Sequence, residues 1–63
     1  MTRKHFNRIA ARIATQRAAI DRLQDSEARV ILRHLAEELA DDFQYFNGAF
    51  DRGRFLRTCG VQE

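Results

Sequence analysis

The sequence has no proline and no tryptophan, a single cysteine, and only three glycines, all within its last sixteen residues. One cysteine excludes an internal disulfide, and no Cys and His residues have the spacing of a four-ligand zinc site. The sequence has no run of 18 apolar residues and no apolar segment after its basic N-terminus, so it predicts neither a membrane span nor a signal peptide. We therefore expect a cytoplasmic protein without metal or cofactor.

The chain is also short. Its 63 residues predict a single domain spanning 1–63, and a core of that size rarely contributes more than about 3–5 kcal/mol. Without a disulfide or a metal, the usual remaining sources of stability are close helix packing and self-association.

The absence of proline and the composition favour helix along most of the chain. Thr2 is a suitable N-cap, and apolar residues then recur at intervals of three and four, which predicts an amphipathic helix over residues 3–23. Met1 and Phe6 have the spacing of a hydrophobic staple. Alternating steps of three and four are typical of a coiled-coil seam. We therefore predict an oligomer seam formed by Phe6, Ile9, Ile13, Gln16, Ile20 and Leu23.

A second apolar stripe, with a period near 3.6, predicts a helix over residues 26–46. The members of this stripe are Ala28, Ile31, Leu32, Leu35, Ala36, Leu39, Phe43 and Phe46. In one continuous helix the two stripes would differ in direction by roughly 70°. A turn near residues 24–26, with Asp25 or Ser26 as the cap of the second helix, avoids this mismatch and gives an antiparallel hairpin. One long helix remains the alternative, because neither glycine nor proline occupies the turn.

The end of the second helix is predicted at Asn47-Gly48, with Gly48 in the left-handed conformation. Tyr45, on the polar side of this helix, is expected to fold over the third helix; the alternative is an anchor for a partner. A short third helix is predicted over residues 52–59. Its terminal signals are an N-cap, a staple pair and a left-handed closing residue: Asp51, Phe50 with Phe55, and Gly60.

The tail F-D-R-G-R-F-L-R-T-C-G, residues 50–60, resembles the ending of small uncharacterised proteins of actinobacterial phages and prophages. Those proteins often close with N-x-x-F-D-R-x-R-F-L-x-x-C-G. The opening M-T-R-K-H-F is similar to the start of the same group. The resemblance implies a small helical phage protein in the host cytoplasm, and it implies no particular activity. The matching positions are Asn47, Phe50, Asp51, Arg52, Arg54, Phe55, Leu56, Cys59 and Gly60.

The formal net charge of +2 is unevenly distributed. Residues 1–22 hold six bases and one acid, a net +5, whereas residues 23–47 hold six acids and two bases, a net −4. Such opposed surfaces can meet between subunits, and the basic one can contact nucleic acid or an acidic protein, an ordinary solvated surface being the alternative. The second and third helices also have the order of a helix-turn-helix, although the third is short. The candidate binding residues are Lys4, Arg8, Arg12 and Arg22, with Arg54 and Arg57 in the third helix.

Nothing in the sequence indicates catalysis. Cys59 and the histidines are far apart, and no nucleophile has both a base and an orienting third group. We expect Cys59 to be a small buried residue and His34 to be exposed rather than a metal ligand. Arg52 is expected to pair with Asp51 or Asp42.

These observations predict an all-α protein. Each chain forms an antiparallel hairpin of two helices closed by a short third helix, and two chains form a homodimer in which the four long helices make a bundle. The predicted function is that of a non-enzymatic, phage-encoded interaction protein that binds itself or a host protein. It needs no small-molecule substrate. The alternative is a nucleic-acid-binding accessory protein that uses the basic surface of the first helix.

Overall fold

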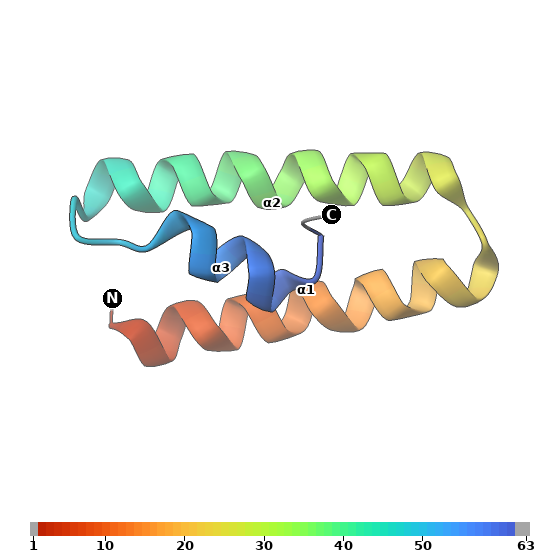
Figure 1. The fold of residues 1–63 in the computed structure, drawn as a ribbon, viewed down its shortest axis with the longest axis horizontal. Coiled ribbons are helices and arrows are strands. Elements are labelled where there is room, and N and C mark those ends of the chain that lie inside the picture. The colour runs from red at the N-terminus through yellow and green to blue at the C-terminus, as the bar shows by residue number, and fades with distance from the viewer. Residues whose placement is uncertain (1, 62–63) are drawn as a thin grey trace.

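The computed structural model describes residues 2–61 and contains three helices: α1 (Arg3–Leu23), α2 (Ser26–Phe46) and α3 (Arg52–Cys59). The described residues form no strand, so the predicted all-helical class is confirmed. Figure 1 shows α1 and α2 side by side, with the chain reversing its direction between them and α3 packed against both. None of these helices is both long and apolar enough to cross a membrane.

The first turn of α1 is held by its N-cap. The backbone N–H of Thr2 donates to Nδ1 of His5 (3.1 Å), and the Thr2 hydroxyl lies 3.0 Å from the same nitrogen. His5 thus takes the place that Glu or Gln usually occupies in a capping box. Met1 lies outside the described residues, so its expected contact with Phe6 stays a prediction.

Aspartates cap the other two helices. The carboxylate of Asp25 accepts a hydrogen bond from the N–H of Ala28, and that of Asp51 accepts one from the N–H of Arg54, both at 3.0 Å. Of the two candidates at the turn, Asp25 is therefore the cap of α2. The prediction for Asp51 is confirmed.

The end of α2 differs from its prediction. Within residues 2–61 only Gln24 (φ 55°) and Gly60 (φ 75°) have positive φ, so the left-handed Gly48 was wrong. Asn47 instead leaves α2 in an extended conformation, and its side-chain oxygen accepts a bond from Ala49 N–H (3.1 Å), which turns the chain without a left-handed residue. At the end of α1 the left-handed position falls on a residue with a Cβ atom, Gln24.

Replacing Gln24 by glycine is expected to raise the free energy of unfolding by about 1 kcal/mol, because glycine adopts positive φ without crowding its own Cβ. Gly60→Ala is the matched control and should lower it by about the same amount, because its φ of 75° strains any side chain. Urea denaturation of both variants measures the two changes. Changes of the same sign would contradict the role assigned to these residues.

The core lies between the three helices and is centred on four aromatic rings. The rings of Phe6, Phe43, Phe50 and Phe55 make five contacts with centroid separations of 4.6–5.6 Å. The contact between Phe50 and Phe55 confirms the predicted staple pair. Phe43 is half-buried, and the other three rings are buried. The remaining buried apolar residues are Ala10, Ile13, Ala36, Ala40, Leu56, Cys59 and Val61.

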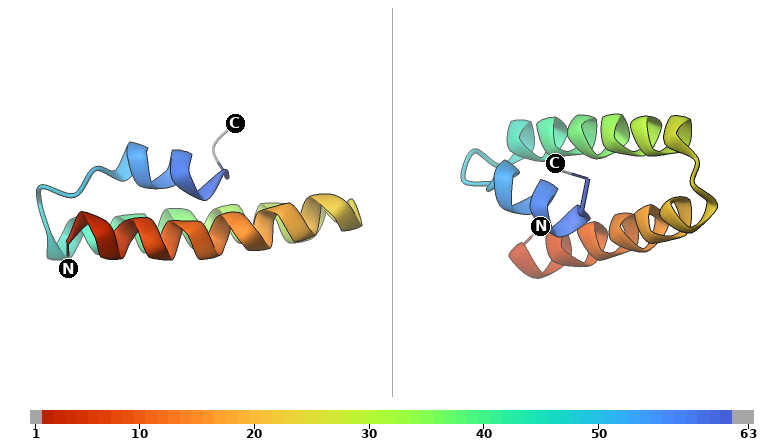
Figure 2. Two further views of the ribbon diagram at one scale, coloured as in Figure 1. Left: turned by 90° about the horizontal axis from the view of Figure 1, so that it is seen from below. Right: turned by 45° about the vertical axis from the view of Figure 1, so that its right-hand side comes forward.

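The third helix covers only one side of the hairpin. In the left view of Figure 2, α3 lies on one side of the plane that contains α1 and α2, and no described segment lies on the other. The Cα atoms span 35 × 18 × 15 Å. One broad side of the two long helices is therefore left uncovered by the described chain.

Candidate functional site

The apolar stripe predicted as an oligomer seam on α1 is divided between two environments. Phe6 and Ile13 are buried in the chain's own core, where they support the fold rather than an interface. The other four members remain available in part: Ile9 and Ile20 are half-buried, and Gln16 and Leu23 are exposed.

The apolar stripe of α2 is divided in the same way. Ala36 and Ala40 are fully buried, whereas Ile31, Leu35 and Phe46 are exposed although the sequence pattern places them in the stripe. The stripe is wider than the contact that α1 and the eight-residue α3 can make with it. Part of it therefore faces outward.

Two contacts show which side of α2 this is. Asp41 pairs with Arg52 of α3 (2.9 Å), and the ring of Phe43 contacts Phe6 of α1. At 100° per residue, Ile31 and Leu35 lie within about 40° of each other and roughly 80–120° from both Asp41 and Phe43. Their side of α2 faces neither α1 nor α3.

On α1 the side that faces α3 is identified by Arg17, which donates to the carbonyl oxygen of Gly60, the residue after α3 (2.9 Å). Arg12, Gln16 and Leu23 lie within about 40° of one another and roughly 100–140° from Arg17. All three are exposed. They occupy the side of α1 that is turned away from α3.

We call this side of the hairpin the open face. Its most exposed apolar side chains are Leu23 (77%), Ile31 (68%) and Phe46 (81%). Contiguous exposed apolar patches often mark binding surfaces, and we therefore take this side as the candidate binding surface. The open face comprises Ile9, Arg12, Gln16, Ile20 and Leu23 of α1, and Ile31, Leu35, Glu38, Asp42 and Phe46 of α2.

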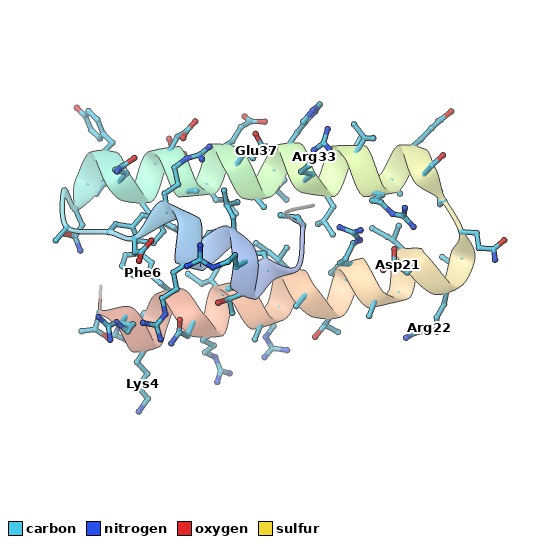
Figure 3. All side chains as sticks on the ribbon, in the orientation of Figure 1. Lys4, Phe6, Asp21, Arg22, Arg33 and Glu37 are labelled. Carbon is cyan, nitrogen blue, oxygen red and sulfur yellow. The ribbon has the colours of Figure 1, made fainter. Side chains whose placement is uncertain are left out.

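The predicted basic residues of α1 are all exposed and form no ion pair within residues 2–61. Figure 3 shows Lys4 and Arg22 extending away from the body of the molecule at the outer edge of α1. At 100° per residue Arg8 falls about 40° from Lys4 and about 40° from Arg12 on the open face. The basic surface thus runs from the outer edge of α1 onto the open face.

The basic residues of α3 lie elsewhere. Arg54 and Arg57 are exposed, but they belong to the helix on the opposite side of the hairpin from the open face. Arg54 borders a cleft of about 190 Å³ together with Arg3, above the rings of Phe6 and Phe50. The structure therefore places Arg54 beside Arg3 and away from Arg8 and Arg12.

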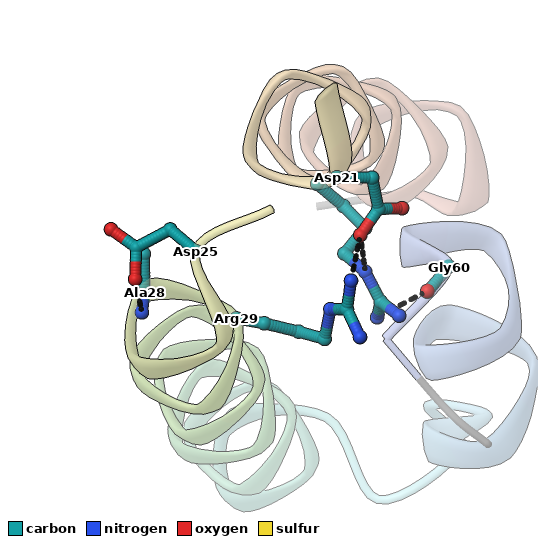
Figure 4. A network of polar contacts seen from close by, with 6 residues as sticks. Asp21, Asp25, Ala28, Arg29 and Gly60 are labelled. Carbon is teal, nitrogen blue, oxygen red and sulfur yellow. Dashed lines mark hydrogen bonds and ion pairs between the residues drawn. The ribbon is translucent and has the colours of Figure 1, made fainter. Parts of the chain in front are cut away.

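A polar network ties the three helices together near the turn (Figure 4). One carboxylate oxygen of Asp21 accepts from Arg17 Nε (3.2 Å) and from Arg29 Nη2 (2.8 Å), while Arg17 also bonds to Gly60. The i,i+4 spacing of Arg17 and Asp21 was the one signal for it in the sequence. The hydrogen bond from Arg17, with the positive charges of Arg17 and Arg29, lowers the pKa of the Asp21 carboxyl from its ordinary value of 3.8.

This lowered pKa predicts a pH dependence. Because Asp21 loses its proton more readily in the folded chain than in the unfolded chain, its contribution to stability is complete above the unfolded pKa and is lost as the pH falls through the folded pKa. We expect Asp21→Asn to be less stable than the wild type at pH 7, with the difference shrinking below pH 3.8. Thermal melts across this range measure it, and a difference that stays constant with pH would contradict the network's role.

Two further predictions about the outer surface were wrong. Arg52 pairs with Asp41 and not with Asp51 or Asp42, because Asp51 is engaged as a helix cap and Asp42 lies on the open face. Tyr45 does not fold over α3. Its side chain is 85% exposed, and its ring contacts Phe46.

The cysteine and histidine side chains that could carry out chemistry do not form a site. Cys59 is fully buried, as expected, and burial raises the pKa of its thiol to about 11. A thiol in that environment stays protonated and unreactive at neutral pH. His34 is exposed on α2, and residues 2–61 hold no group of three or more side chains positioned to bind a metal ion.

Comparisons of the chain with protein-family models, with curated proteins and with solved structures find no match. The surface itself offers two features for function: the open face, and the basic side chains that continue from it along α1.

Proposed function

We propose that the chain is a non-enzymatic interaction protein that acts by self-association through the open face. The observation that carries this proposal is the exposure of Leu23, Ile31 and Phe46 on the side of the hairpin that α3 leaves uncovered. Burying one such side chain contributes about 1.5–3 kcal/mol. That is a large gain for a chain of this size, whose own core rarely supplies more than about 3–5 kcal/mol.

The broad side of the molecule is of the same order of size as one side of a stable protein interface. The broad side of the molecule measures 35 × 18 Å between Cα atoms, a projected area of roughly 600 Å². A stable interface buries about 800 Å² of accessible surface on each partner. Two open faces packed together would give the four-helix arrangement typical of small helical bundles.

Analytical ultracentrifugation over a wide range of protein concentration tests self-association. We expect a species of twice the 7.4 kDa chain mass that dissociates on dilution. A single species of 7.4 kDa at every concentration would overturn the proposal.

The second candidate function is nucleic-acid binding. It is favoured by the exposed basic side chains of α1 that have no ion-pair partner in the described chain: Lys4, Arg8, Arg12 and Arg22. Fluorescence anisotropy with a short DNA duplex at low and at moderate salt tests it, because phosphate contacts weaken steeply with salt. Binding that is lost in Arg8→Glu with Arg12→Glu would support this function, and no binding at low salt would remove it.

We also propose that the protein is phage-encoded and acts in the cytoplasm of the host. The support for this is the resemblance of its tail at residues 50–60. A host protein that presents an apolar helix is then the competing occupant of the open face. A heterocomplex that displaces the homodimer in ultracentrifugation, and that is lost in the Ile31→Glu variant, would identify such a partner.

A further inference from the structure

We infer that two copies join their open faces about a twofold axis parallel to the helices, so that α1 of each copy lies along α2 of its partner. This inference rests on the proposed self-association and specifies its geometry. It predicts which charged residues meet across the interface, namely Arg12 with the partner's Glu38 and Arg8 with the partner's Asp42.

The register follows from contacts within one copy. The rings of Phe6 and Phe43 are 4.9 Å apart, and Asp21 pairs with Arg29 at 2.8 Å. In these pairs the two residue numbers add up to 49 and 50. A residue of α1 therefore lies at the same height along the helix axes as the residue of α2 for which the two numbers add up to 49 or 50. We call two such residues level.

This rule places two bases level with two acids. Arg12 is level with Glu38, and Arg8 is level with Asp42. Within one chain these pairs do not form: Glu38 and Asp42 are exposed and make no ion pair within residues 2–61. Four charges that make no ion pair within residues 2–61 thus stand at matching levels, three of them on the open face and Arg8 at its edge.

A twofold axis parallel to the helices preserves the level of every residue and carries α1 onto the partner's α2. Each copy then places its two bases opposite the partner's two acids, so the symmetric interface gains four opposite-charge contacts. The same operation sets the half-buried Ile20 of α1 beside the partner's Ile31, because residue 20 is level with residues 29–30. Apolar and charged groups agree on the same register.

The other face-to-face arrangement has its twofold axis across the helices. It lays α1 on the partner's α1 and α2 on the partner's α2. Since residues 1–22 carry a net +5 and residues 23–47 a net −4, like charges would then face each other. Juxtaposed like charges across an interface are unfavourable, so the charges select the parallel axis.

Charge reversal tests the arrangement with two variants of the full chain. The acid variant combines Arg8→Glu with Arg12→Glu, and the base variant combines Glu38→Arg with Asp42→Arg. Each variant alone brings like charges together and is expected to dimerise roughly 100-fold more weakly than the wild type. An equimolar mixture restores all four opposite-charge contacts and should form a heterodimer within about tenfold of the wild-type affinity.

Lys4→Glu with Arg22→Glu is the matched control, because it makes the same change in net charge at the outer edge of α1, away from the open face. It should dimerise about as well as the wild type. Circular dichroism shows whether each variant keeps its helices, and native mass spectrometry of the mixture counts homodimers and heterodimers. Wild-type dimers with no preference for the heterodimer would overturn this geometry and leave the proposed function intact, whereas a monomeric wild type would overturn both.

Discussion

Replacing Phe50 by alanine is expected to leave the chain largely unfolded at 25 °C. Phe50 lies outside the helices, in the connection between α2 and α3, yet its ring is buried against Phe6, Phe43 and Phe55. Removing a buried phenylalanine ring costs about 3–5 kcal/mol. A core of this size supplies no more than about that amount, so the loss is comparable with the whole stability of the fold.

Far-UV circular dichroism and urea denaturation at one fixed protein concentration measure this effect. The concentration is held constant because self-association stabilises the folded state by mass action. Tyr45→Ala is the control. It removes another aromatic ring, but one that is 85% exposed, and it should change the free energy of unfolding by no more than about 0.5 kcal/mol. Equal losses in the two variants would contradict the placement of the core.

Replacing Ile31 by glutamate is expected to raise the dissociation constant of the dimer by about 100-fold or more. In the proposed interface Ile31 becomes buried, and a carboxylate there would lose its water without gaining a partner. About 2.7 kcal/mol, a fraction of the cost of burying an unpaired charge, already corresponds to a factor of 100. In the monomer the same side chain is 68% exposed, so the substitution leaves the fold itself intact.

Val30→Glu is the matched control for this prediction. Val30 is the adjacent residue and is also exposed, but 100° of helix rotation turns it toward the side of α2 that bears Asp41. Sedimentation equilibrium of the two variants gives both dissociation constants. If Val30→Glu weakened the dimer as strongly as Ile31→Glu, the interface would not be the open face.

The helices could be predicted from the sequence because their signals are local. A cap residue such as Asp51, the apolar period, and Gly60 after α3 act within a few residues of the helix ends that they set. The ends of α1 and α2 were harder. The left-handed residue after α1 is Gln24, which is not a glycine, and Gly48 after α2 does not take that conformation. Backbone conformation at a turn depends on the packing of the helices that it joins, and residue type alone does not determine it.

The candidate site was only partly predictable for a related reason. Apolar periodicity identifies the stripe on α1, but it does not say which neighbour each member meets. Phe6 and Leu23 belong to the same stripe, yet α3 and α2 bury the first and leave the second exposed. The network around Asp21 likewise requires Arg29, which is eight residues away on another helix. The sequence spacing therefore indicates the pair of Arg17 with Asp21 but not the pair of Arg29 with Asp21.

The central claim, that the open face is where two copies meet, is tested most directly by isotope-filtered nuclear Overhauser spectroscopy on a mixture of labelled and unlabelled protein. The mixture reports only contacts between different copies. Cross-peaks from the methyl groups of Ile31 and Leu35 to protons of Ile20 and Gln16 in the other copy are the predicted result. Cross-peaks confined to Val30 or α3, or none at all in a sample shown to be dimeric, would contradict it.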